Sequence, residues 1–260
     1  MDYLVVDIET IPDVTTGRRL YGLQGIDDDL AVAEAMFLQR RNETGGSAFL
    51  RHTLQQIVCI SCLLRTDEHL KIWSLSGDAN SEKEMLIRFF SGLERYVPVL
   101  VTWNGLAFDL PVLSYRALLH GVTASLFWEQ GERDREFRYN NYLNRYHQRH
   151  IDLMDTLSLF QSKAVQRLDH VACLLGFPGK MGLSGEDVWP AWQAGRFSQV
   201  RTYCETDVMN TWLVFLRFQR MRNQLTEEGL QQEEQRLKQL LESGSEPVWH
   251  EFLQEWQNER

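Results

Sequence analysis

The sequence predicts a mixed α/β layer fold, in which helices flank a central sheet and a helical extension follows at the C-terminus. Three observations support this class. Residues 3–9 form a continuous apolar run, typical of a strand that is covered on both faces. Two further strand-like segments, 55–64 and 69–75, lie close enough in the chain to pair as a hairpin. Helical and strand patterns then alternate to residue 222, as in a layered sheet with flanking helices.

The remaining elements are expected from apolar periodicity bounded by turn residues. They are strands at 98–103 and 150–155 and helices at 28–41, 81–96, 110–122, 166–175 and 198–222. Ser81 and Glu84 form a capping box at the start of helix 81–96. We expect Asp155 and Ser198 to cap the helices that follow them.

The amino-acid composition limits the classes of protein to which this chain can belong. The chain is 43% hydrophobic and 24% charged, which is ordinary for a globular protein. No apolar run approaches the roughly 18 residues that span a bilayer, and the early first strand leaves no room for a signal peptide, so we expect no membrane association. Four cysteines in 260 residues indicate a reducing compartment rather than a disulfide framework. We therefore expect a cytoplasmic protein.

Carboxylates follow strands at two places in the sequence. Asp7 and Glu9 end the first strand and, being two residues apart, lie on the same face. Like charges this close raise each other's pKa unless a cation lies between them, so the pair predicts a divalent cation site. Asp109 follows strand 98–103, and it can join them if the two strands are parallel neighbours. Each pattern alone also has an ordinary explanation as a turn or a helix cap.

A late helix carries the third pattern, in which Tyr203 and Asp207 are four residues apart and share a face. In this order, Asp-x-Glu, Asn-x3-Phe-Asp (104–109) and Tyr-x3-Asp resemble the three exonuclease motifs of the DnaQ-like superfamily, and Tyr203 is typical of the DEDDy branch. The wider run "LDHVACLLGFPGKMG…V…YCETDV" resembles the predicted 3′–5′ exonucleases related to the proofreading domain of family B DNA polymerases. The resemblance covers roughly residues 3–220 and implies a ribonuclease H-like fold.

The resemblance also implies a reaction. It is metal-dependent hydrolysis of single-stranded DNA or RNA from the 3′ end, releasing nucleoside 5′-monophosphates by a two-metal mechanism. The metal ligands would be Asp7, which bridges both ions, and Glu9, Asp109 and Asp207. Their hard oxygen atoms suit two divalent cations, Mg²⁺ or Mn²⁺. Tyr203 would orient the attacking water.

Substrate contacts are carried over from the same resemblance. Thr10 and Ile11 match positions that touch the terminal nucleotide. Asn104 and Phe108 match positions at the penultimate sugar and the last base, although Phe108 also suits plain core packing. Lys180, in the Gly-rich segment 176–182, is a candidate for a phosphate contact.

Two other functions compete with the exonuclease. One is a non-catalytic nucleic-acid-binding module on the same fold, which has no need of clustered acids that repel phosphate. The other is a phosphatase with Asp7 as nucleophile, which lacks the second Asp and the Lys/Thr support that such enzymes show. The chain contains no polymerase domain, so any proofreading would act in trans.

Three further segments leave alternatives open. Cys59 and Cys62 form a C-x2-C pair without a second pair, so buried thiols are favoured over a zinc site. Residues 133–150 combine five Arg with Phe137 and three Tyr, which suits either single-strand binding or a surface loop whose rings pack inward.

The last segment, residues 223–260, is an acidic helical tail that follows an expected exonuclease domain of residues 1–222. It holds nine Glu against three basic residues, a net charge of −6 that leaves −3 for the first 222 residues. Its pattern predicts two amphipathic helices broken at Gly244–Pro247. The tail either repels a bound strand or docks on the body through its Leu and Trp side chains.

Overall fold

The computed structural model describes residues 2–258, and its centre is a five-stranded sheet with the order β3-β2-β1-β4-β5. The strands are β1 (Tyr3–Pro12), β2 (Gln55–Arg65), β3 (Leu70–Ser76), β4 (Val99–Thr102) and β5 (His150–Asp152). β1, β2 and β3 pair antiparallel, whereas β4 is parallel to both β1 and β5. The expected hairpin and the parallel pairing of the first strand with strand 98–103 are both confirmed.

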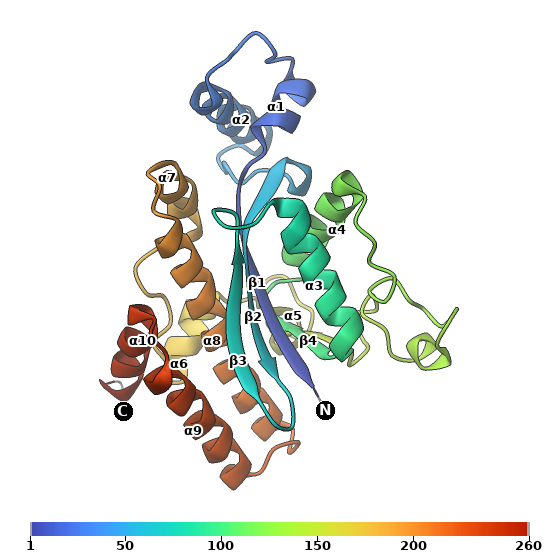
Figure 1. The fold of residues 1–260 in the computed structure, drawn as a ribbon, viewed down its shortest axis with the longest axis vertical. Coiled ribbons are helices and arrows are strands. Elements are labelled where there is room, and N and C mark those ends of the chain that lie inside the picture. Colours follow the sequence, from blue (N-terminus) through green and yellow to red (C-terminus); the bar gives the residue numbers. More distant parts are fainter. Residues whose placement is uncertain (1, 259–260) are drawn as a thin grey trace.

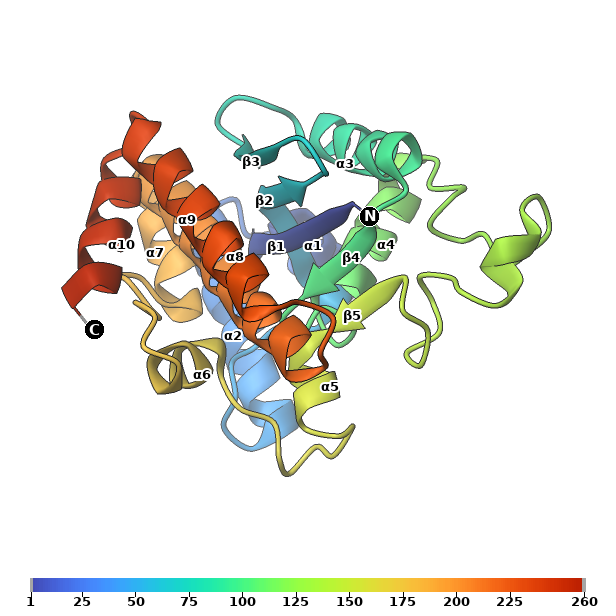
Figure 2. The ribbon, with the colours of Figure 1, turned by 90° about the horizontal axis from the view of Figure 1, so that it is seen from below.

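Helices cover both faces of this sheet (Figures 1 and 2). They are α1 (Val14–Tyr21), α2 (Asp29–Thr44), α3 (Glu82–Tyr96), α4 (Asp109–His120), α5 (Leu153–Leu157), α6 (Leu168–Leu174), α7 (Val188–Gln193), α8 (Phe197–Met221), α9 (Glu227–Ser243) and α10 (Pro247–Asn258). α3 and α4 lie on one face, α8 crosses the other, and α1 and α2 lie beyond the carboxyl end of β1 (Figure 1). The arrangement confirms the predicted α/β class and a ribonuclease H-like fold.

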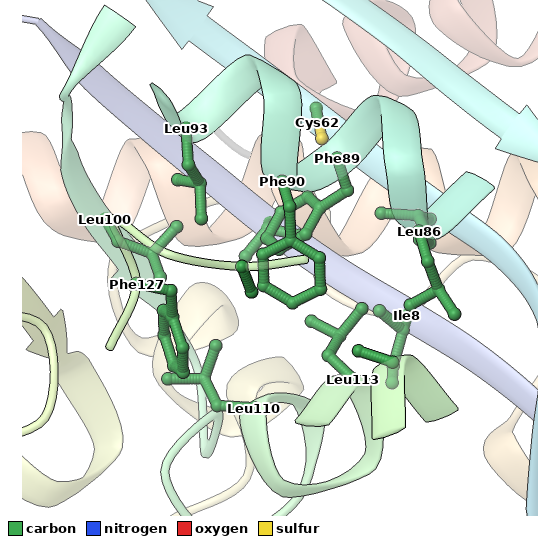
Figure 3. Close-up of a cluster of buried hydrophobic side chains, with 14 of the residues drawn as sticks. Ile8, Cys62, Leu86, Phe89, Phe90, Leu93, Leu100, Leu110, Leu113 and Phe127 are labelled. Carbon is green, nitrogen blue, oxygen red and sulfur yellow. The ribbon is translucent and has the colours of Figure 1, made fainter. Parts of the chain in front are cut away.

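Alternation along β1 decides what each face meets. Leu4, Val6 and Ile8 join the core beneath α3 and α4, where Figure 3 shows Ile8 among Leu86, Phe90 and Leu113. Val5 points to the opposite face and packs in the core that α8 covers. Because Asp7 and Glu9 continue the series of Val5, they belong to the α8 face.

Some local predictions were wrong. Asp155 lies inside α5, and the helix is capped by Asp152, whose side chain accepts a hydrogen bond from the Asp155 N–H. α8 begins after Arg196 without a side-chain cap, so Ser198 is not one. α1 was not predicted, because Gly17 interrupts its helical pattern. A Cβ at this position would collide with the Met36 side chain of α2, so the absence of a side chain lets the two helices pack closely here.

A buried ion-pair network fixes the carboxyl end of β1 to α3 and α4. Arg116 on α4 pairs with Asp13, directly after β1, at 2.5 Å and with Glu82 of α3 at 2.5 Å. Glu82 also accepts from His120 at 2.7 Å and from the backbone N–H of Ile57 at 2.7 Å. Burial raises the pKa of Asp13, but hydrogen bonds from Thr16 and Arg116 outweigh it, so the pKa is lowered overall. A buried network satisfied in this way holds its members in one arrangement.

The acidic tail docks on the body. Leu237, Leu241, Phe252 and Trp256 are fully buried in the core that α8 covers. The tail carboxylates pair with arginines of the body, and these ion pairs are Arg65–Glu233 at 2.7 Å, Arg217–Glu234 at 2.9 Å, Arg201–Glu246 at 3.1 Å and Arg220–Glu227 at 3.2 Å. The docking alternative therefore describes the tail, and its helices break at Gly244 as expected.

The aromatic rings of segment 133–150 divide between core and surface. Phe137 and Tyr142 are buried, and the Arg149 guanidinium lies over both rings, 4.1 Å and 5.9 Å from their centroids. Tyr139 and Tyr146 are exposed. Inward packing thus accounts for half of the ring set, and strand binding by this segment stays a prediction.

Trp256→Ala tests whether the tail belongs to the folding unit. The Trp256 ring is fully buried, edge-on to Phe177 at 6.0 Å, with the Lys238 ammonium 4.7 Å from its centroid. Removing a buried Trp leaves a cavity, so we expect urea denaturation to show a loss of roughly 3–5 kcal/mol in a single transition. Trp128→Ala is the control, because that side chain is 54% exposed. Equal stability of the two variants would show that the tail is not part of the core.

Candidate active site

Two carboxylates of the site come from the carboxyl half of β1. Asp7 pairs with Ser61 and Glu9 with Cys59 of β2, and the register shifts between Glu9 and Thr10, where Val58 is the extra residue. A bulge of this kind bends the strand and is common beside functional sites. Here it follows Glu9 directly and separates the acidic positions from the strand end at Pro12.

Asp109 reaches β1 from the neighbouring strand. It is the first residue of α4, and its Oδ1 accepts a hydrogen bond of 3.1 Å from the backbone N–H of Ile8, between the two β1 acids. The preceding loop is tightly constrained. Asn104 has a left-handed φ of 65°, and a Cβ on Gly105 would collide with Thr102.

Asp152 fastens the same loop from the other side. Its carboxylate accepts from the N–H groups of Asn104 at 3.0 Å and Leu106 at 2.9 Å. Asp152 therefore holds the loop that precedes Asp109, in addition to capping α5.

α8 supplies Asp207 and Tyr203 from the opposite direction. This helix packs across β1 and β2, and the Tyr203 ring lies against the small core of Ile11, Val58 and Cys204. The Tyr203 hydroxyl lies close enough to the Asp207 carboxyl to lower the pKa of that group. The i, i+4 spacing thus brings both side chains to the β1 acids, as predicted.

Electrostatics joins the four acids into one cluster. Burial, followed by repulsion from Asp109 and Asp207, raises the pKa of Asp7 well above its usual value. Burial and then Asp7 do the same to Glu9. Burial raises the pKa of Asp109 and of Asp207 to about 7 in each case. The pKa of Tyr203 is raised by burial, then by Asp207 and Glu9, so its hydroxyl stays protonated.

This donor set fits a divalent cation. Several carboxylates that raise one another's pKa bind either protons or positive charge. Their oxygen atoms are the hard ligands that Mg²⁺ and Mn²⁺ prefer. Asp7 and Glu9, together with Cys204, also offer ligand atoms that all lie within 4.8 Å of one another. The residues present therefore suit bound metal at this edge of the sheet.

Lys180 brings positive charge to the cluster, since it lowers the pKa of Asp207. The loop that carries it is fastened to α8 by Asn210, which is fully buried. The Asn210 Nδ2 donates to the Gly179 carbonyl at 2.7 Å, and the Gly179 N–H donates back to Oδ1 at 3.2 Å. Gly179 has a left-handed φ of 62°, which favours glycine. One helix thus positions Asp207 and, through its next turn, Lys180.

The other expected substrate contacts lie around the same acids. The Thr10 hydroxyl donates to Gln55 at 2.8 Å. Ile11 is only 7% exposed and packs with Val58 and Cys204, so little of it can touch a ligand. Asn104 and Phe108 are half-buried and flank the loop before Asp109.

Sequence reasoning missed the place of Cys204 in the site. Its thiol donates to both the backbone carbonyl and Oδ2 of Asp7, at 3.3 Å each. The available signal was helical spacing, because Cys204 precedes Asp207 by three residues and so shares its face. Cys59 and Cys62 are buried free thiols in separate cores, which confirms the preference over a zinc pair.

The raised pKa values predict how the metal-free protein responds to pH. A carboxyl whose pKa is raised by folding stabilises the fold at low pH, and this contribution is lost as pH rises through the folded value. For Asp109 and Asp207 that value is about 7. In EDTA, Tm should therefore fall from about pH 4, near the ordinary pKa of 3.8, to about pH 7 and then level off, and Asp207→Asn should flatten the fall.

The control for this measurement is Glu251→Gln, which changes an exposed carboxylate of α10. It should keep the wild-type slope of Tm against pH. Added Mg²⁺ or Mn²⁺ should raise Tm most at the alkaline end. An unchanged slope in Asp207→Asn would contradict the coupling of the acids.

The chain also matches a known protein family. Residues 47–256 match the family described as "Predicted 3'-5' exonuclease related to the exonuclease domain of PolB". The match contains Asp109, Tyr203 and Asp207, whereas Asp7 and Glu9 lie before it. It also runs through most of the tail, so the expected end of the resemblance near residue 220 was wrong. No curated protein gives a significant match. The chain belongs to the family of predicted 3′–5′ exonucleases related to the exonuclease domain of PolB.

Proposed function

We propose that this protein is a metal-dependent 3′–5′ exonuclease that hydrolyses single-stranded DNA or RNA from the 3′ end and releases nucleoside 5′-monophosphates. The observation that carries the proposal is the meeting of Asp7 and Glu9 of β1 with Asp109 of α4 and Asp207 of α8. A module that only binds nucleic acid gains nothing from this cluster, because the acids repel the phosphate backbone.

The four carboxylates would hold two divalent ions, Mg²⁺ or Mn²⁺. When bound, such ions supply Lewis-acid stabilisation of the charge that develops on the phosphate during hydrolysis. The chain's own contribution is to hold the ligands in place. The Ile8 N–H fixes one oxygen of Asp109, and the Cys204 thiol fixes one oxygen of Asp7.

Tyr203 and Lys180 would act on the water and the phosphate. Because the Tyr203 hydroxyl stays protonated and lies beside Asp207, it would orient a water next to the acids. Lys180 would bind a phosphate oxygen of the substrate, and Asn210 would hold its loop toward α8. We assign this chemistry to residues 1–222 and structural support to the tail.

The cellular location is the last part of the proposal. In the part of the chain that the structure describes, no helix is long and apolar enough to cross a membrane. All four cysteines are free thiols, as is typical of a reducing compartment, and we propose the cytoplasm.

Asp207→Asn should abolish hydrolysis and leave the fold intact, because this carboxylate would serve only to hold metal. The assay incubates 5′-end-labelled single-stranded DNA and RNA with Mg²⁺ or Mn²⁺ and resolves the products. A ladder that shortens from the 3′ end, together with nucleoside 5′-monophosphate, supports the proposal. Binding without shortening would favour the non-catalytic module, and near-normal turnover by Asp207→Asn would refute the metal assignment.

Tyr203→Phe should slow hydrolysis by roughly 10²-fold without abolishing it, as expected for a group that positions the attacking water. The effect should fall on kcat rather than on KM, because the hydroxyl would act on the water and not on the strand. Tyr115→Phe is the control, since that side chain is exposed on α4. Unchanged kcat in Tyr203→Phe would leave Tyr203 a purely structural role.

A further inference from the structure

Three rings gather where the segment between α2 and β2 meets the start of α4. Phe49 and His52 both lie against Phe108, with ring centroids 5.3 Å and 6.0 Å away. Phe49 is 58% exposed, whereas Phe108 and His52 are half-buried. Because Phe108 directly precedes Asp109, the rings form an aromatic surface, open to solvent, at the border of the acidic cluster.

Hydrogen bonds tie this aromatic surface to the site on two sides. The His52 Nε2 lies 2.7 Å from the Ala107 carbonyl, two residues before Asp109. On the other side, Gln55 joins the Thr10 hydroxyl at 2.8 Å to the Leu50 carbonyl at 3.2 Å. The segment that carries Phe49 is therefore held between the residue after Glu9 and the residues before Asp109.

The backbone that carries the exposed Phe49 ring is also fixed by contacts with α2. The Arg40 Nε donates to the Phe49 carbonyl at 2.8 Å. The next residue, Leu50, is buried with Leu54 against Val32 and Met36 of α2. An apolar ring presented to solvent on a fixed backbone is arranged in advance for a flat ligand, which lowers the entropy lost on binding.

We propose that Phe49 and His52, which the family resemblance does not assign, extend the Phe108 position into a stacking surface for a nucleobase close to the 3′ end of the substrate strand. The inference rests on the proposed function, in which the neighbouring acids, with bound metal, would act on the phosphate group of that nucleotide. Aromatic side chains stack on every base, since each has a π-face. The surface therefore favours single strands, whose bases are free to stack, and does not select a sequence.

Phe49→Ala tests the proposal in a binding measurement. Single-stranded oligonucleotides carry 2-aminopurine at the last, penultimate or third position from the 3′ end, and stacking quenches its fluorescence. Ca²⁺ replaces Mg²⁺ so that hydrolysis is slow. Phe49→Ala should weaken binding about tenfold and relieve the quenching at one of the three positions. Phe49→Trp should keep both, because it retains a flat ring.

The matched control is Leu38→Ala, since Leu38 is an apolar side chain of α2 that is 57% exposed. It should bind like the wild type. An oligonucleotide with abasic sites at its last three positions should bind the wild type and Phe49→Ala alike, because it offers no base that could stack there. Wild-type affinity and quenching in Phe49→Ala at all three positions would overturn the stacking surface. A wild type that does not shorten end-labelled strands in Mn²⁺ would instead refute the exonuclease, while the fluorescence result would still decide the stacking.

Discussion

The burial of four neighbouring carboxylates is the constraint on which this structure depends. Burial raises the pKa of Asp7, Glu9, Asp109 and Asp207, and repulsion from neighbouring acids adds to it, so the metal-free fold must hold charge in a buried place. Parallel pairing of β1 with β4 brings two of the contributing segments to the same edge of the sheet. The Arg116 network then joins the end of β1 to α3 and α4, close to the edge where the acids meet. The fold stabilises a site that is unfavourable without bound cations.

α8 connects the site to the rest of the molecule. One of its faces lies in the core, one carries Tyr203 and Asp207, and its arginines meet the acidic tail. The tail therefore supports the helix that positions one of the acids. Its negative charge, which is the source of most of the −9 of the chain, is largely opposed by Arg65, Arg201, Arg217 and Arg220. The acidic composition thus says little about the surface around the site.

The segment between β1 and β2 has a second role besides linking two strands. α1 and α2 lie beyond the carboxyl end of β1, and the stretch after them returns past the site before it enters β2 (Figure 1). Gln55, His52 and Phe49 contact the flanks of two acidic positions on this return path. The segment between β1 and β2 therefore contacts the residues beside two of the acids.

The sequence by itself determined the order of the strands along the chain, the capping box at Ser81 and the faces on which Asp7, Glu9 and Asp207 lie. These features depend on side chains two to four residues apart and on local hydrogen bonds. A short stretch of the sequence is therefore enough to predict them. Only the tertiary structure decided that Cys204 contacts Asp7, that Asn210 holds the Lys180 loop and that Phe49 borders Phe108. Each of these contacts joins segments between about 30 and 200 residues apart, and close packing of side chains, which no local pattern encodes, sets their distances. The same reason explains Gly17, whose missing side chain has meaning only against Met36 of the neighbouring helix.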